Sequence, residues 1–312
     1  ALSSLYGFAP GEVDLACFPL FALFDGALGM TSIFPRLDPR RPAQCEPAEI
    51  VRAACEFRPT LTFGSPAIWR RVVPYCSERG LQLGSLRRVL IAGAPVPPAL
   101  IADFQKILAP EAEVHTPYGA TEALPVTSIA GRELFPARVE KTNAGAGTCV
   151  GCAAPGVEIR IARIQDGPIE RWNAELEQKS GLAGEVCVRG AVVTALYAED
   201  ECATRAAKIR ADDGGGDWHR MGDVGRLDEE GYLWFHGRAS QRLETEKGAR
   251  LPVPAENVFN RHPRVCRTAL VGIGARGSER PLLIVQPIPG ALPRSDRETQ
   301  AFLLELRELG RS

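Results

Sequence analysis

The chain has 312 residues, of which 45% are hydrophobic and 24% are charged. These proportions are typical of a soluble globular protein and exclude an extensively disordered chain, and the length suffices for one large domain plus part of another. The formal net charge is −1. A nearly neutral chain has no field that attracts nucleic acid or an anionic membrane, so any phosphate would have to be held by a local site.

Cysteine usage and hydropathy narrow the class further. The chain has nine cysteines, an odd number without regular spacing, which does not predict a disulfide framework and favours a reducing cytoplasm. No apolar run reaches the roughly 20 residues that a membrane-spanning helix needs. The sequence begins at Ala1 without a charged signal region. We therefore expect a cytoplasmic protein with no membrane span, of which this chain is an internal part.

From residue 47 to residue 116, helical and strand patterns alternate. The sequence predicts helices at 47–57, 66–79 and 97–108, and short buried strands at 60–63, 87–92 and 113–116. Such alternation predicts a mainly parallel sheet covered by helices, in which ligands bind at the carboxyl ends of the strands. Residues 93–95 and 118–122 each follow one of these strands, so we place both segments at that edge of the sheet.

Beyond about residue 131, short strands separated by glycines replace this alternation. Strand patterns at 157–161, 184–190 and 232–235 predict a β-rich subdomain, and the polar, glycine-dense segment 212–217 predicts an exposed loop. From residue 237 the pattern indicates a small α+β region with strands near 268–272 and 282–286. A helix is predicted from Asp296, because Ser295 to Glu298 has the form of a capping box.

Three segments contain the residue types that bind an adenylate. Residues 116–122 read Thr-Pro-Tyr-Gly-Ala-Thr-Glu, and about 100 residues later come Met221-Gly222-Asp223 and Gly237-Arg238. They supply an aromatic face for the base, a hydroxyl for phosphate, carboxylates for metal and ribose, and a guanidinium for sugar or phosphate. Each segment alone also fits an ordinary structure, such as a core tyrosine, a helix-capping Thr-Glu pair or a Gly-Asp turn. Their order and spacing favour a nucleotide site.

In this order the segments resemble the superfamily of adenylate-forming enzymes, which contains acyl-CoA synthetases, luciferases and the adenylation domains of peptide synthetases. Residues 116–122, 18–25 and 219–225 are most similar to the OleC-type β-lactone synthetases of bacterial olefin biosynthesis, and the similarity extends to 145–151. The resemblance implies that residues 1–236 form the C-terminal half of the AMP-binding domain. Residues 237–245 would then be a hinge, and 246–312 an incomplete small C-terminal α+β domain.

The resemblance assigns a role to each motif residue. Thr121 would hold the α-phosphate and Glu122 the Mg²⁺ ion, and these two would be the catalytic residues. Asp223 on a tight turn would accept hydrogen bonds from both ribose hydroxyls, and Arg238 would reach ribose or phosphate. The residues around the base would be Gly93, Ala94, Pro95, Tyr118 and Gly119, where Gly119 would leave space that a side chain would otherwise fill.

The same resemblance implies an apolar substrate pocket. Its residues would be Phe21, Ala22, Phe63, Gly64 and Ala123. Ala22 stands where the family often has histidine or an aromatic residue, which suits a bulky branched acyl chain. After Arg238 the usual hinge residues are replaced by Ala-Ser-Gln-Arg-Leu-Glu at 239–244, which changes residues that dock the thiol arm of CoA. The family's usual threonine is Met221 here, so that contact is absent or replaced.

Three other motifs do not predict additional sites. Residues 145–151 are one residue too long for the dinucleotide-binding Gly-x-Gly-x-x-Gly motif. Cys149 and Cys152 lack a second Cys or His pair at zinc spacing, so we expect them to be structural. The four histidines show no metal-binding pattern, and no Gly-x-Ser-x-Gly elbow indicates an esterase.

The resulting hypothesis is ATP-dependent adenylation of a 2-alkyl-3-hydroxy fatty acid, followed by attack of its own β-hydroxyl to form a β-lactone. The expected cofactors are ATP and Mg²⁺, and the expected partner is a carboxylic acid, with other enzymes of a hydrocarbon-forming assembly as further candidates and no nucleic acid. The family's phosphate loop and C-terminal lysine are missing, so we expect the chain alone to adenylate poorly or not at all. An acyl-CoA ligase and a noncatalytic nucleotide-binding or assembly module stay open as alternatives.

Overall fold

The computed structural model describes residues 2–311, which form two compact units. The first unit holds the residues up to 135 together with 151–156, and the second holds 136–150 and the residues from 157 onward. Both units combine helices with sheets, and a parallel sheet lies in the first, which confirms the predicted α/β class. The predicted hinge at 237–245 falls inside the second unit, so the predicted boundary at residue 237 stays a prediction.

A mainly parallel sheet forms the centre of the first unit. Its strands lie in the order β2-β1-β3-β4-β5-β6. β1 to β5 are parallel to their neighbours, and β6 returns antiparallel to β5. β3 and β4 are short apolar runs and are almost wholly buried, as expected for parallel strands covered on both faces. The strand bounds are β1 Val13–Ala16, β2 Thr31–Ile33, β3 Leu61–Gly64, β4 Arg88–Ile91, β5 Glu113–Ala120 and β6 Ala123–Ala130.

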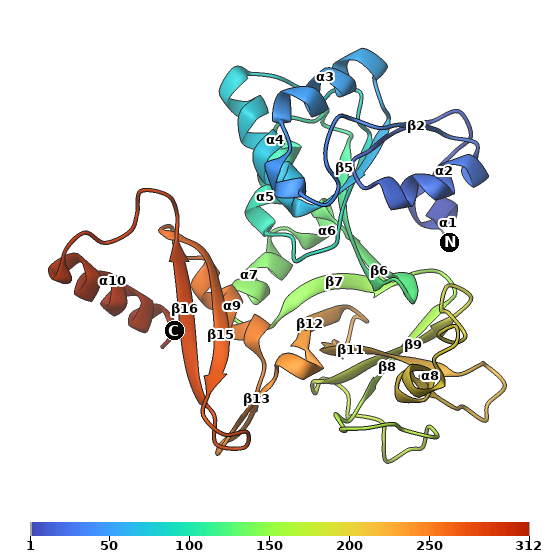
Figure 1. The fold of residues 1–312 in the computed structure, drawn as a ribbon, viewed down its shortest axis with the longest axis vertical. Helices are drawn as coiled ribbons and strands as arrows, with labels where there is room; N and C mark the ends of the chain where they lie inside the picture. The colour runs from blue at the N-terminus through green and yellow to red at the C-terminus, as the bar shows by residue number, and fades with distance from the viewer. Residues whose placement is uncertain (1, 312) are drawn as a thin grey trace. The chain divides into compact units, whose positions relative to one another are not determined.

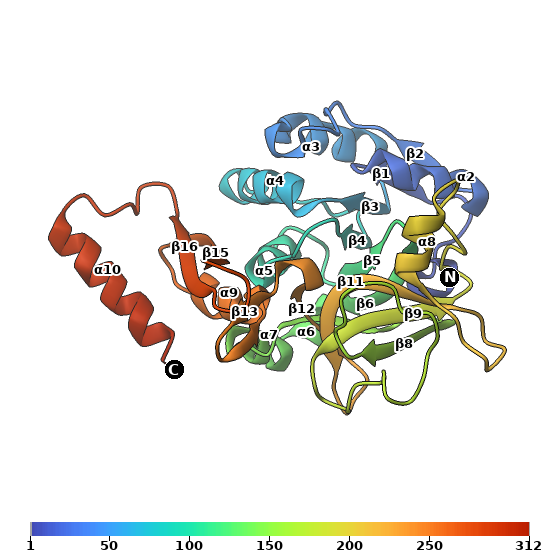
Figure 2. The same ribbon diagram turned by 60° about the horizontal axis from the view of Figure 1, so that its bottom comes forward.

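Helices cover both faces of this sheet: α3, α4 and α5 lie along one side, and α1 and α2 along the other (Figure 2). α3 and α4 have the predicted bounds. Each begins with a proline, whose missing N–H costs nothing in the first turn, and α4 ends before Gly80 in the left-handed conformation. The helix bounds are α1 Leu2–Tyr6, α2 Ala22–Leu28, α3 Pro47–Phe57, α4 Pro66–Arg79, α5 Pro98–Gln105 and α6 Gly131–Leu134, with 3-10 helices at Pro19–Phe21 and Pro42–Gln44.

Two predicted elements of the first unit end at other residues. The helix predicted at 97–108 ends at Gln105, because the next three residues donate to carbonyls three residues back and so form tighter turns. The strand predicted at 113–116 continues to Ala120, because β6 supplies an antiparallel partner along this stretch. Tertiary pairing therefore extends the strand through the Tyr-Gly segment.

An antiparallel sheet of order β12-β11-β9-β8 forms the centre of the second unit. The three strands predicted here are all present, although β12 runs on to Arg238, and segment 212–217 is the predicted exposed loop. Along the chain, β7 passes from the second unit into the first at Gly151. Its last residues pair with β6. The bounds are α7 Ala137–Asn143, β7 Thr148–Ala153, β8 Val157–Ala162, β9 Gly184–Gly190, α8 Glu201–Ala207, β10 Lys208–Ile209, β11 Trp218–Leu227 and β12 Leu233–Arg238.

The end of the second unit packs a helix beside a β-hairpin (Figure 1). Phe302 and Leu306 of α10 are buried with Val265 of β15. The predicted N-terminus of this helix is confirmed, because the hydroxyl of Ser295 accepts from the N–H of Glu298 at 3.2 Å. The bounds are β13 Leu243–Thr245, β14 Gly248–Arg250, α9 Pro252–Asn260, β15 Val265–Ile273, β16 Arg280–Pro287 and α10 Asp296–Leu309, with a 3-10 helix at Ala239–Gln241.

Within residues 2–311, no helix combines the length and the hydropathy that crossing a membrane requires. Each of the nine cysteines is free, including Cys149 and Cys152 on β7.

Gly151 and Gly156 allow a test of how tightly β6 and β7 pack. Both have a positive φ, but a Cβ at Gly151 would collide with the carbonyl of Ser128 on β6, whereas one at Gly156 would meet no atom within 4 Å. Gly156→Ala should lower the free energy of unfolding by about 1 to 2 kcal/mol through φ alone. Gly151→Ala should cost about 1 to 3 kcal/mol more, because the backbone must shift. Urea unfolding measures both values, and equal losses would contradict the packing described here.

Candidate functional site

The segment Gly93–Pro95 follows the carboxyl end of β4, as the sequence predicts. Its three residues are exposed, and Gly93 has a φ of +88°, a conformation in which a side chain is strained. The loop therefore presents backbone groups to solvent with little side-chain cover.

Thr121 and Glu122 form the turn of the β5–β6 hairpin. Because a strand follows them, they do not cap a helix. Thr121 is exposed and Glu122 is half-buried, and Tyr118 lies before the turn, opposite Thr127 of β6. The hairpin thus holds an aromatic ring, a hydroxyl and a carboxylate within five residues of chain.

Two of the predicted site glycines have a packing reason of their own. A Cβ at Gly119 would lie 2.5 Å from the carbonyl oxygen of Ala123, the first residue of β6. At Gly64 it would lie 2.7 Å from Nε1 of the buried Trp69. The hairpin and α4 therefore require these glycines without any ligand, so the assignment of both residues to a ligand pocket stays a prediction.

Asp223 lies inside strand β11, so the tight turn predicted from its flanking glycines is wrong. Gly222 has a φ of +66°, and the register of β11 against β12 shifts after Val224. The glycines therefore mark an irregular, bulged strand rather than a turn. In this strand Asp223 is the cross-strand partner of Arg238 on β12.

The structure brings Asp223 and Arg238 together as an ion pair. Nη1 of Arg238 lies 3.0 Å from Oδ1 of Asp223 and donates to the carbonyl oxygen of Met221 at 3.1 Å. Asp223 is only 5% exposed, whereas the Arg238 side chain is 53% exposed. A buried carboxylate needs such a partner because burying an unpaired charge is costly. The pair therefore presents a fixed carboxylate beneath a guanidinium that faces solvent.

An apolar cavity lies in the first unit, on the side of the sheet that α1 and α2 cover. Of the predicted pocket residues, Phe21 and Phe63 line it, and their rings meet edge to face with centroids 4.0 Å apart. Tyr6 and Leu90 extend the same wall. Ala22, Gly64 and Ala123 do not line this cavity.

Sequence reasoning missed two acids that line this cavity, Asp14 on β1 and Asp25 on α2. They are 2% and 4% exposed. Their carboxyl groups share a hydrogen bond, and burial together with the charge of Asp25 raises the pKa of Asp14 to about 8. Ser32 donates to Oδ2 of Asp25 at 2.6 Å. The available signal was an acid in the otherwise apolar strand Val13–Ala16.

The metal-binding groups are sparse. Among residues 2–311 no three Asp, Glu, His or Cys side chains are grouped as a metal site. A Mg²⁺ ion that takes most of its ligands from phosphate and water needs only one or two carboxylates. The half-buried Glu122 on the turn, beside the exposed Thr121, has the oxygen donors that such an ion prefers.

The family model and two of the most similar curated proteins agree on one family. Residues 5–198 match the family model described as AMP-binding enzyme. The chain is 44% identical over 305 residues to the olefin beta-lactone synthetase of Xanthomonas campestris, and 46% identical over 292 residues to that of Stenotrophomonas maltophilia. These matches cover 97% and 93% of this chain but 54% and 52% of the relatives. The chain thus spans about half the length of these curated relatives.

Other relatives and solved structures are more distant. The chain is 31% identical over 298 residues to a long-chain-fatty-acid–CoA ligase of Thermus thermophilus, a match that covers 94% of this chain and 49% of the ligase. The amide bond synthetase McbA from Marinactinospora thermotolerans superposes with a TM-score of 0.77 at 25% identity, covering 99% of this chain and 57% of that one. An anthranilate CoA ligase with bound anthranoyl-AMP shares the fold, with a TM-score of 0.72 at 19% identity, covering 98% and 56% of the two chains.

The acid pair predicts an unusual pH dependence of stability. Asp14 is ordinarily deprotonated above pH 4, but in the fold its pKa is about 8. Between these values the unfolded chain binds fewer protons, so this group lowers the free energy of unfolding as pH rises from about 4 to 8. Ionisable groups near Asp14 include Asp25 of α2, Tyr6 in the wall of the same cavity, the buried thiol of Cys17, and the ion pair of Glu12, just before β1, with Arg88 of β4.

Asp14→Asn should therefore gain stability relative to the wild type as pH rises, by at least about 1 kcal/mol across this window. The free energy of unfolding in urea, measured at about pH 4.5 and about pH 8 near the two ends of this pH range, tests the prediction. Asp38→Asn, a change at an exposed site on the same unit, serves as the control and should show no such gain. Parallel pH curves for Asp14→Asn and the wild type would show that Asp14 is ionised in the fold.

Proposed function

We propose, on the premise that the chain belongs to the family of AMP-binding enzymes, that the intact protein adenylates a 2-alkyl-3-hydroxy fatty acid and closes it to a β-lactone. The observation that carries this proposal is the identity of 44% and 46% to two olefin beta-lactone synthetases along almost the whole chain. ATP would supply the adenylate, and pyrophosphate and AMP would be released. The relatives with this name are about twice as long as this chain, so the activity is proposed for the intact protein.

Asp223 and Arg238 are proposed to hold the ribose. A carboxylate held in a strand can accept hydrogen bonds from two neighbouring ribose hydroxyls, and its ion pair fixes the direction of its oxygens. Arg238 is exposed enough to reach a ribose or phosphate oxygen while it stays beside Asp223. Tyr118 and the loop Gly93–Pro95 are proposed to contact the base, the former through its ring and the latter through its backbone.

Thr121 and Glu122 are proposed to act on the phosphate. When bound, Mg²⁺ neutralises charge on the phosphate oxygens of ATP. Glu122 would hold the ion, and the hydroxyl of Thr121 would donate to an α-phosphate oxygen. The attacking carboxylate needs little help from a protein base, because phosphoryl and nucleotidyl transfer depend mainly on positioning and charge neutralisation.

The second step is proposed to use a nucleophile within the substrate. The β-hydroxyl oxygen attacks the acyl carbonyl, the bond from that carbon to the AMP oxygen breaks, and the hydroxyl proton is lost. AMP leaves with the electron pair, so no external acceptor is needed. Effective molarities for well-oriented groups reach about 10⁵ to 10⁸ M, which favours this attack over an intermolecular one. Phe21 and Phe63 would hold the alkyl part in the apolar cavity.

A CoA ligase is the second candidate, supported by the 31% identity to the Thermus thermophilus ligase. The sequence after Arg238, where residues 239–244 differ from the family's usual hinge, favours the CoA-independent reaction. We further propose residues 237–245 as the hinge. Other enzymes of a hydrocarbon-forming assembly are proposed as partners on the basis of the relatives' names.

Product analysis distinguishes the two candidates. With ATP, Mg²⁺ and a long-chain 2-alkyl-3-hydroxy acid, the intact protein should form a β-lactone, AMP and pyrophosphate in equal amounts, with or without CoA. The matched control is the same acid without its hydroxyl, which should stop at bound acyl-AMP. A CoA thioester from either acid would identify a ligase instead.

A further inference from the structure

The apolar cavity of the first unit runs along the strands of the parallel sheet. Pro117 and Leu124 line one end of it, next to the hairpin that bears Thr121 and Glu122. Asp14 and Leu61 line the other end. The walls between them are mostly aromatic and aliphatic, contributed by Tyr6, Phe21, Phe63 and Leu90.

Strand register gives the distance between the two ends. Asp14 is in register with Leu61, Leu61 with Arg88, and Arg88 with Glu113. Pro117 lies four residues further along β5 than Glu113, so the cavity extends about 13 Å along the strand direction at roughly 3.3 Å per residue. This is a length that an extended alkyl chain can fill.

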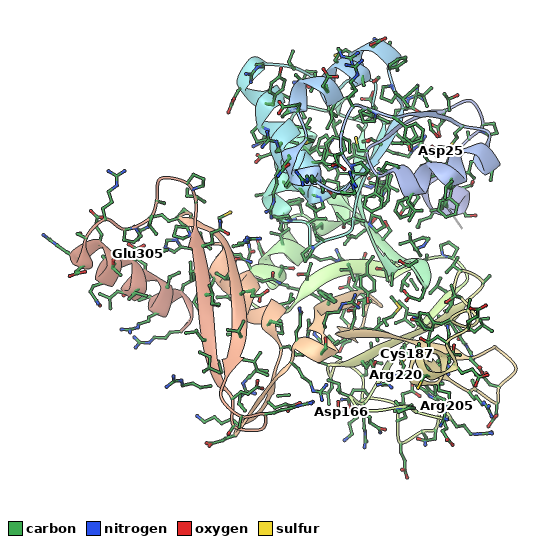
Figure 3. All side chains as sticks on the ribbon, viewed as in Figure 1. Asp25, Asp166, Cys187, Arg205, Arg220 and Glu305 are labelled. Atoms are coloured by element: carbon green, nitrogen blue, oxygen red, sulfur yellow. The ribbon has the colours of Figure 1, made fainter. Side chains whose placement is uncertain are left out.

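The far end of this cavity is polar although its walls are not. Asp25 lies on α2 (Figure 3), and Asp14 faces it from β1. Among residues 2–311, Oδ1 of Asp14 has no hydrogen-bond partner, and it has less than 1 Å² of exposed surface. Buried polar atoms without partners are uncommon and cost stability, so a leucine would serve the fold better at this position.

We propose that the Asp14–Asp25 pair is the polar floor of an acyl-chain cavity and limits the length of alkyl chain that the cavity accepts. This inference rests on the proposed function, because it takes the cavity to be the site of the substrate's alkyl part. A chain that stops short of the floor leaves room for water beside the acid pair. The cavity has about 40 Å³ of space open to water, and a single water needs roughly 10 to 15 Å³ of it.

A longer chain removes this water and covers the acid pair with methylene groups. Leaving a buried acceptor without a partner is penalised by roughly tenfold to a hundredfold in affinity. Affinity should therefore rise with chain length, as more apolar surface is buried, and then fall once the chain reaches Asp14.

A binding measurement tests this without relying on catalysis. Saturated fatty acids from octanoic to octadecanoic acid are used to displace a fluorescent fatty acid from the intact protein. Asp14→Leu keeps the branched shape but removes the polar atoms, so the fall at long chains should disappear and the longest acid should bind at least about tenfold tighter than to the wild type. Asp14→Asn keeps a polar floor and should keep the fall. The control is Leu61→Met, which replaces one apolar side chain with another at the residue in register with Asp14. This variant should also keep the fall in affinity for long chains.

The wild type alone provides a second arm. ω-Hydroxyhexadecanoic acid should bind more tightly than hexadecanoic acid, because its hydroxyl can bond to Asp14, and Asp14→Leu should reverse this order. Unchanged length profiles in Asp14→Leu, or weaker binding of the hydroxylated acid to the wild type, would overturn the inference. If the length limit holds but no acid stimulates pyrophosphate release, the proposed function fails while the inference stands.

Discussion

The candidate nucleotide site depends on one interaction, the ion pair between Asp223 and Arg238. Asp223 is almost fully buried in a ten-residue strand, and its partner on the next strand is exposed. The pair explains how a carboxylate can be buried inside the sheet and still lie beside a group that reaches solvent. Gly222, with its positive φ, and the register shift after Val224 make β11 irregular beside Asp223. In a regular ladder the residues next to Asp223 would have different cross-strand partners.

The same region contains a second buried arginine–carboxylate pair, whose hydrogen bonds all lie within the fold. Arg220 bonds Glu185 across β11 and β9 through two nitrogens, and three backbone carbonyls take up its remaining donors. Arg220 and Asp166 are both labelled in Figure 3. Asp166 forms its ion pair with Arg242 at 2.8 Å rather than with Arg220. Arg238 differs from Arg220, because half of its side chain is exposed and it makes few bonds within the fold. Arg238 is thus the arginine of this group with donors available to a ligand.

Much of the fold could be predicted from local sequence. α3 and α4 were predicted to the residue, because proline marks the first turn of each and the helical pattern stops at the last residue of each. The length of β5 could not be predicted locally, since it depends on pairing with β6. The glycines around Asp223 suggested a turn, because glycine with a positive φ occurs both in turns and in bulged strands. The pairing of β11 with β9 and β12 decides between the two, and local sequence does not show this pairing.

The candidate site was predictable only in part. The motif residues were found through their resemblance to a family, and that family is now shown. The pairing of Asp223 with Arg238, 15 positions later in the chain, required the register of β11 against β12. Asp14 and Asp25 were missed because each is an isolated acid in the sequence, and only the packing of α2 on β1 brings their carboxyl groups together. Burial, which gives them their significance, is not visible in a pattern of residues.

Nucleotide binding tests the central claim most directly. Calorimetric titration of ATP into the intact protein would compare the wild type with Asp223→Ala, and with Asp212→Ala as a control that removes an exposed, ion-paired aspartate of the same unit. Loss of hydrogen bonds to a charged acceptor should weaken ATP binding by about tenfold to a hundredfold in Asp223→Ala and leave Asp212→Ala unchanged. An unchanged ATP affinity in a folded Asp223→Ala variant would contradict the account.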